Sequence, residues 1–221
     1  MLDNMIKIWM KYDYVFLEGL WGTLWLAVIT VFFGTVLGTV VSLMRMSRWK
    51  GLYMVSSVYI EVLRGTPILL QLYFFWLLLP KVLPIEMSDT SCIVVALIIN
   101  SSSYVAEVIR AGIQAVDKGQ MEAARSLGLS GRGAMRWVIL PQAVKNILPA
   151  LGNEFIQMVK ETSLASVFFV GELMTSYKTV QSATYLALPS LLIVGIIYFA
   201  VTFLLSRAMK TLELRLKAGS C

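Results

Sequence analysis

Apolar residues fall into five long runs, and short segments rich in charge separate these runs. A helix that crosses a membrane needs about 20 consecutive, mostly apolar residues. The first run, from Gly19 to Met44, contains no charged residue and meets this requirement best. The pattern predicts one all-α transmembrane domain over residues 1–221, with about five transmembrane helices, at 19–44, 52–79, 92–112, 143–170 and 186–209.

The second run is interrupted near its middle. It contains Glu61 and Arg64, followed by the sequence Gly65-Thr66-Pro67. Proline removes a backbone donor and glycine permits unusual dihedral angles, so a helix is expected to break here. We predict a slanting first helix followed by the part that spans the membrane. The break is either a hinge or a fixed kink.

Lysine and arginine are distributed unevenly over the segments between the runs. In membrane proteins, short cytoplasmic connections carry an excess of these residues. Most of the 19 Lys and Arg residues lie after the first run, after the third run and in the C-terminal tail: Arg45, Arg48, Lys50, Arg110, Lys118, Arg125, Arg132, Arg136, Lys145, Arg207, Lys210, Arg215 and Lys217. We therefore expect the N-terminus outside, the C-terminus in the cytoplasm, and segment 118–138 on the cytoplasmic side.

The composition agrees with a membrane protein and excludes several kinds of site. The chain is 58% hydrophobic and 14% charged, whereas soluble domains are about half apolar and a quarter charged. Histidine is absent and the two cysteines are Cys92 and Cys221, so neither a His/Cys metal site nor a disulfide framework is expected. The N-terminal residues contain no small-residue cleavage site, so we expect no cleaved signal peptide. The net charge is +6, and the basic residues gather at the ends of the apolar runs. This distribution is typical of residues that set membrane topology and contact lipid head groups, so we expect no nucleic acid partner.

The cytoplasmic segment 118–138 is unusually rich in small and basic residues. Residues 120–127 are typical of one short helix, with Gly128 as its C-terminal stop and Ser130 as the N-cap of the next helix. Pro141 marks the turn into the fourth span, because a helix can begin at proline but not continue backwards through it.

The first of these short helices carries an Ala123-Ala124 pair. We expect the two alanines to leave one side of the helix bare, so that a partner surface can approach closely. Such a segment fits a groove on a cytoplasmic partner protein. It equally fits an amphipathic segment that lies on anionic lipid. The residues alone leave both interpretations open.

A spaced motif in this segment resembles a known family signature. Glu122-Ala123-Ala124 is followed after three residues by Gly128, and after nine more by Val138, Ile139 and Leu140-Pro141. This spacing resembles the "EAA" signature of ABC importer permeases, with Val138 as the one departure because isoleucine is usual there. Other stretches resemble the polar amino acid permeases within that family: residues 59–67, 100–107, 152–155 and 160–164.

The resemblance implies a permease subunit of an ATP-driven importer in a bacterial inner membrane. It implies a type I ABC importer fold in which Glu122, Ala123, Ala124 and Gly128 couple the chain to a separate ATPase. Expected partners are two cytoplasmic ATPase subunits, a second copy or a homologous permease, a solute-binding protein outside, an amino acid and membrane lipids. The chain has no Gly-x-x-x-x-Gly-Lys-Ser/Thr phosphate cradle, so we expect no cofactor here and ATP with Mg on the partner ATPase.

Polar residues inside two predicted spans are candidates for solute binding, since polar groups in a membrane usually face a cavity or a partner. The third span contains Asn100 and Ser101 near its middle. In the fourth span polar residues recur every three or four positions and share one helical face about 12 Å long: Asn153, Glu154, Gln157, Lys160 and Glu161. An alternative is that all of these residues hold helices together.

The charges of these residues indicate roles in binding an amino acid. Lys160 would hold the α-carboxylate, Glu154 or Glu161 the α-ammonium, and Asn100 would add neutral hydrogen bonds. Two acids against one base leave a negative surplus, which would suit a basic amino acid.

Two further patterns have a structural and a functional interpretation, and the structural one is favoured in both. Glu61, Arg64, Glu107 and Arg110 form either a static set of ion pairs or a gate. Gly34-x-x-x-Gly38 permits close helix packing, either within the bundle or between two copies. Two rivals to the importer are a transporter or channel driven by an ion gradient, and a membrane anchor for a signalling complex.

Overall fold

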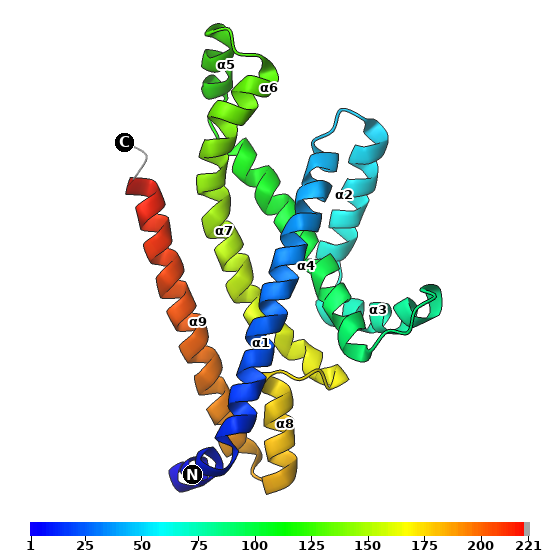
Figure 1. Cartoon of the computed structure of the whole chain (residues 1–221), viewed down its shortest axis with the longest axis vertical. Coiled ribbons are helices and arrows are strands. Elements are labelled where there is room, and N and C mark those ends of the chain that lie inside the picture. The colour runs from blue at the N-terminus through cyan, green and yellow to red at the C-terminus, as the bar shows by residue number, and fades with distance from the viewer. Residues whose placement is uncertain (219–221) are drawn as a thin grey trace.

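A computed structural model describes residues 1–218, and all regular structure in that range is helical (Figure 1). The short helices α5 and α6 lie at one end of the elongated molecule, together with the end of α9, while the N-terminus lies at the other end. The long helices are α1 (Leu2–Arg45), α2 (Lys50–Gly65), α3 (Ile68–Val82), α4 (Asp89–Gln114), α7 (Leu140–Glu161) and α9 (Ala187–Ala218). The short elements are α5 (Lys118–Ser126), α6 (Gly131–Ala134), a π-helical turn (Met135–Ile139), a 3-10 helix (Thr162–Phe168) and α8 (Leu173–Thr184).

The helices support an all-α membrane protein with three or four candidate spans within residues 1–218. Three helices, α1, α4 and α9, are long and apolar enough to cross a membrane, and the bent pair α2–α3 makes a fourth candidate. A helix also lies at the fourth predicted run, but α7 contains too many polar residues to qualify by composition. The same polar residues that make α7 a candidate for solute binding lower its hydropathy below that of the candidate spans.

The fourth predicted run, 143–170, is not one helix. The α-helical part ends at Glu161 and continues as the 3-10 helix to Phe168, which stops at Phe169 in a left-handed conformation with φ 54°. The α-helix α7 begins at Leu140 with Pro141 in its first turn, as predicted. The expectation that helical structure does not continue backwards through the proline is wrong, because the chain is helical from Gly131 onward and the N–H of Leu140 donates to the Met135 carbonyl in a π-helical turn. This wider turn accommodates the proline ring, which would clash in a regular α-helix.

The predicted break in the second run is present as a 114° bend between α2 and α3. Because Pro67 has no N–H, the Leu63 carbonyl loses its normal helical partner. The Gln71 side chain replaces that partner: its Nε2 donates to the Leu63 carbonyl at 2.7 Å and to the Thr66 carbonyl at 3.1 Å. This bracing favours a fixed kink over a hinge.

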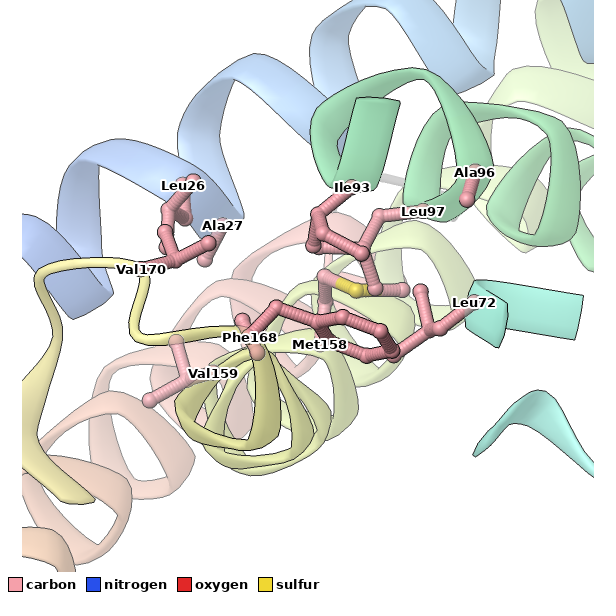
Figure 2. Close-up of a cluster of buried hydrophobic side chains, with 11 residues drawn as sticks. Leu26, Ala27, Leu72, Ile93, Ala96, Leu97, Met158, Val159, Phe168 and Val170 are labelled. Carbon is pink, nitrogen blue, oxygen red and sulfur yellow. The ribbon is translucent and has the colours of Figure 1, made fainter. Parts of the chain in front are cut away.

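The main core lies where α1, α3, α4, α7 and the 3-10 helix meet (Figure 2). Phe168 projects from the 3-10 helix and its ring centroid lies 4.8 Å from that of Tyr73 and 5.5 Å from that of Trp76. The other buried members are Leu26, Ala27, Leu72, Ile93, Ala96, Leu97, Met158, Val159, Ala165 and Val170. This core fixes α4 against α7, and these two helices carry most of the predicted solute-binding residues.

The glycine pair of α1 permits close contact with α4 of the same chain. A Cβ atom at Gly34 would lie 2.9 Å from Ser101 Oγ, and one at Gly38 would lie 2.7 Å from the backbone oxygen of Ser102. Both glycines are buried. The favoured interpretation, packing within the bundle, is therefore confirmed.

We predict that Gly38→Ala destabilises the protein, because the added methyl group collides with backbone and cannot be relieved by a side-chain movement. The expected loss is about 1–3 kcal/mol in the free energy of unfolding, measured by thermal or denaturant unfolding in detergent. Gly51→Ala is the matched control, since a Cβ there meets nothing within 4 Å. Equal stability of the two variants would contradict the close packing of α1 and α4.

Candidate functional site

A buried polar cluster lies where α3, α4 and α7 meet. Asn100 and Glu154 are 2% and 8% exposed. Asn100 Nδ2 donates to Gln71 Oε1 at 2.8 Å, and Ser101 Oγ donates to Glu154 Oε1 at 3.1 Å. The structure thus brings together three of the predicted residues, Asn100, Ser101 and Glu154, from two different predicted spans.

The cluster has more acceptors than donors. Asn100 Oδ1 is buried and has no hydrogen-bond partner in the described part of the chain. The Glu154 carboxylate accepts its one hydrogen bond within residues 1–218 from Ser101. Buried acceptors without donors carry an energetic penalty. A ligand that brings N–H donors or a positive charge would relieve that penalty.

The other predicted residues of α7 are more exposed than Glu154. Asn153, Gln157 and Lys160 are exposed and Glu161 is half-buried. Gln157 Nε2 donates to Glu161 Oε1 at 2.9 Å. The predicted stripe is therefore not uniform in burial, because Glu154 is the one buried residue among these five.

Lys160 does not contact the buried cluster. It lines a separate cavity of about 430 Å³ together with Ser163, Met174 and Tyr198. No ion pair joins Lys160 to Glu161 or Glu154 in the described residues. The Lys160 ammonium group is therefore available to a ligand that enters this separate cavity.

Gln71 belongs to the buried cluster, and the sequence reasoning missed it. Its amide group braces the α2–α3 break through Nε2, while Oε1 accepts from Asn100. The sequence contains one usable signal: Gln71 is a polar residue in a long apolar run, four positions after the helix-breaking Pro67. Gln71 thus links the position of Asn100 to the geometry of the break.

Glu172, a second buried acid, has a structural role. It is fully buried as the N-cap of α8, and it accepts from the N–H groups of Met174 and Thr175 at 2.8 and 2.7 Å and from the Tyr198 hydroxyl at 3.0 Å. Burial raises the pKa of the Glu172 carboxyl, and these hydrogen bonds oppose the rise. Because its acceptors are used, Glu172 holds α8 and α9 together and offers no free group to a solute.

Segment 118–138 folds locally as predicted. Helix α5 ends next to Gly128, which has φ +88°, and Ser130 caps α6 by accepting from the Gly133 N–H. A positive φ explains glycine at the turn.

The prediction that both alanines leave one side of the helix bare is wrong for Ala124. Ala123 is exposed, but Ala124 is 4% exposed because α5 packs against the π-helical turn. The free face of this short helix therefore carries Glu122 and Ala123, and it is followed by Leu127, which is 85% exposed.

The four charged residues considered as a gate form one ion pair in the described part of the chain. Glu107 pairs with Arg110 on the same helix, α4. Arg64 instead lies over the Tyr104 ring, 5.4 Å from its centroid. Because this pair lies within one helix, it does not join two spans, and the static interpretation stays the favoured prediction.

Comparison with known proteins identifies relatives that cover nearly the whole chain. The family described as "Binding-protein-dependent transport system inner membrane component" matches residues 30–218. The arginine transport system permease protein ArtQ of Bacillus subtilis (strain 168) is 41% identical over 92% of this chain and 93% of its own length. The putative glutamine transport system permease protein GlnP of Rickettsia conorii is 36% identical over 96% and 97%.

Solved structures show the same arrangement of helices. The crystal structure of an amino acid ABC transporter with histidines matches with a TM-score of 0.89 and 47% identity, over 93% of this chain and 96% of that chain. An inward-facing structure of the MetNI methionine ABC transporter matches with a TM-score of 0.70 and 19% identity, over 90% and 97%, and this likeness concerns the fold alone.

Proposed function

The chain belongs to the binding-protein-dependent transport system inner membrane components, and we propose that it conducts a polar amino acid that binds where α3, α4 and α7 meet. As a permease subunit it does not hydrolyse ATP, and an ATPase and a solute-binding protein are its partners. The relatives named for arginine and glutamine transport, and the transporter solved with histidines, support a polar amino acid as the solute.

One observation carries this proposal: within residues 1–218 the buried Glu154 carboxylate accepts a single hydrogen bond, from Ser101, and Oδ1 of Asn100, the residue before Ser101, accepts none. An α-ammonium group supplies both charge and donors, so it matches these acceptors. Ser101 and Asn100 add neutral contacts. Asn153 and Gln157 are exposed on α7 and Glu161 is half-buried, and these three residues are proposed to contact the solute side chain.

The charges support a preference for basic amino acids. Glu161 adds a second carboxylate to α7, and the hydrogen bond that it accepts within the described part of the chain comes from Gln157. A cationic side chain would be attracted to it. We propose that Lys160 attracts the α-carboxylate from the separate cavity that it lines. It does not do so while Glu154 holds the α-ammonium group, because the six residues between the two side chains span about 9 Å along a helix.

The proposed topology has five crossings, with α7 as the crossing that composition alone does not support. The N-terminus lies outside, and α5 and the C-terminal end of α9 lie in the cytoplasm. A polar helix can cross a bilayer when its polar side faces a cavity or a partner. We propose that two permease chains, either identical or homologous, assemble with two ATPase subunits, and that the free face of α5 docks on the ATPase.

The test of the proposed function is purification with the neighbouring subunits, reconstitution in proteoliposomes with the binding protein, and a panel of amino acids scored by stimulated ATP hydrolysis. We expect stimulation by polar amino acids, with basic ones the strongest. Hydrolysis that ignores every amino acid, together with uptake driven by an ion gradient without ATP, would favour the gradient-driven rival.

We predict that Lys160→Met weakens uptake of every amino acid by about tenfold, because the loss of one charge-assisted bond corresponds to about 1.5–3 kcal/mol. The measurement is the concentration dependence of uptake in proteoliposomes. Lys178→Met is the control, since Lys178 donates to the Ser166 carbonyl and has no proposed contact with the solute. Unchanged uptake by Lys160→Met at normal expression would remove Lys160 from the site.

A further inference from the structure

A cavity of about 400 Å³ lies between the C-terminal end of α1, the second half of α2 and α4. Its polar lining consists of Arg45, Glu61, Arg64 and Tyr104. None of these residues belongs to the cluster of Gln71, Asn100, Ser101 and Glu154. In the proposed topology the cavity lies in the cytoplasmic half of the protein, because Arg45 is the last residue of α1.

The two arginines of this cavity have unmet binding capacity. Arg45 Nη1 is buried and has no hydrogen-bond partner in the described part of the chain. Arg64 stacks on Tyr104 and forms no ion pair within residues 1–218. A charged donor that is buried without an acceptor is unfavourable. An acceptor bound in the cavity would remove this penalty.

The nearby carboxylates do not supply that acceptor. Glu107 binds Arg110 through both of its carboxylate oxygens. Glu61 lines the cavity but forms no ion pair with Arg45 or Arg64 in the described residues. Within the described residues neither carboxylate forms an ion pair with Arg45 or Arg64, so both guanidinium groups are open to an acceptor that binds in the cavity.

We propose that this cavity binds an oxyanion of the phosphate class between Arg45 and Arg64. The planar guanidinium group matches the oxygen atoms of phosphate, and such charge-assisted bonds are among the strongest hydrogen bonds in proteins. The phosphate belongs either to an anionic lipid of the cytoplasmic leaflet or to a free cytosolic anion, since both present the same oxygens. Bound there, it connects the end of α1 to α2 beside the break at Gly65.

The test uses the purified full-length chain and three variants: Arg45→Gln, Arg64→Gln and Arg48→Gln. Arg48 is the matched control because it is exposed, follows α1 closely and does not line the cavity. In one arm, native mass spectrometry counts the molecules of dioleoyl phosphatidylglycerol retained per chain. In the other arm, equilibrium dialysis measures binding of radiolabelled inorganic phosphate to chains in neutral detergent.

We expect Arg45→Gln and Arg64→Gln each to weaken binding by about tenfold, while Arg48→Gln stays near wild type. If the two cavity variants lose phosphatidylglycerol in the mass spectra, the bound group is a lipid phosphate. If they lose only the binding of inorganic phosphate, it is a free anion. Equal effects of all three variants, or no saturable binding in either arm, would overturn the proposal. If Arg45→Gln fails to fold, Arg64→Gln decides, because the Arg64 side chain is exposed.

Discussion

Ala123→Arg is expected to abolish ATP-driven uptake and co-purification with the ATPase, while the chain still inserts into the membrane. Ala123 is exposed on the free face of α5, whereas its neighbour Ala124 is buried on the face that packs against the rest of the protein. The arginine side chain leaves the fold intact but adds volume and charge where the ATPase is proposed to dock. Disruption of a central interface contact costs at least about 2 kcal/mol, or roughly 30-fold in affinity.

The control for this prediction is Gly51→Arg, which adds the same side chain to another exposed position at the proposed cytoplasmic face. Both variants are compared by pull-down of the ATPase and by uptake into proteoliposomes. Wild-type uptake by Ala123→Arg would support the gradient-driven rival and would contradict docking through α5.

Glu154→Gln is expected to lower the uptake efficiency by at least about tenfold, because it removes the negative charge that is proposed to hold the α-ammonium group. Glutamine has nearly the same shape, so the packing of α4 against α7 should persist. Initial rates of uptake are measured over a range of amino acid concentrations. An increase in the half-saturating concentration is the expected signature of lost binding.

Glu86→Gln serves as the comparison, since Glu86 is an exposed acid outside the proposed spans. Ser101→Ala should have a smaller effect than Glu154→Gln, because it removes only a neutral donor to the carboxylate. Uptake by Glu154→Gln that equals wild type, at equal expression, would assign Glu154 to helix packing and remove it from the proposed solute site.

Features governed by neighbouring residues could be predicted from the sequence. Gly128 and Ser130 were identified as a helix stop and an N-cap, and both act in this way. The break at Gly65-Thr66-Pro67 is predicted from the missing backbone donor of proline and the conformational freedom of glycine.

Features that depend on distant parts of the chain could not be predicted. The burial of Ala124 requires the π-helical turn, which lies more than ten residues away. The uneven burial of the polar stripe on α7 depends on which side of that helix faces α4. Gln71 joins the site because the bend turns α3 towards Asn100, and no local pattern specifies the direction of a bend.

The most direct measurement of the central claim is cross-linking from α5 to the ATPase. Ala123→Cys is made in a chain in which Cys221 is serine, while Cys92 is kept because it is 1% exposed. A short bifunctional maleimide is applied to inside-out vesicles that contain the assembled complex. The account predicts a permease–ATPase adduct whose yield changes when ATP is added. No adduct, together with labelling of the cysteine from the outer side of intact cells, would contradict it.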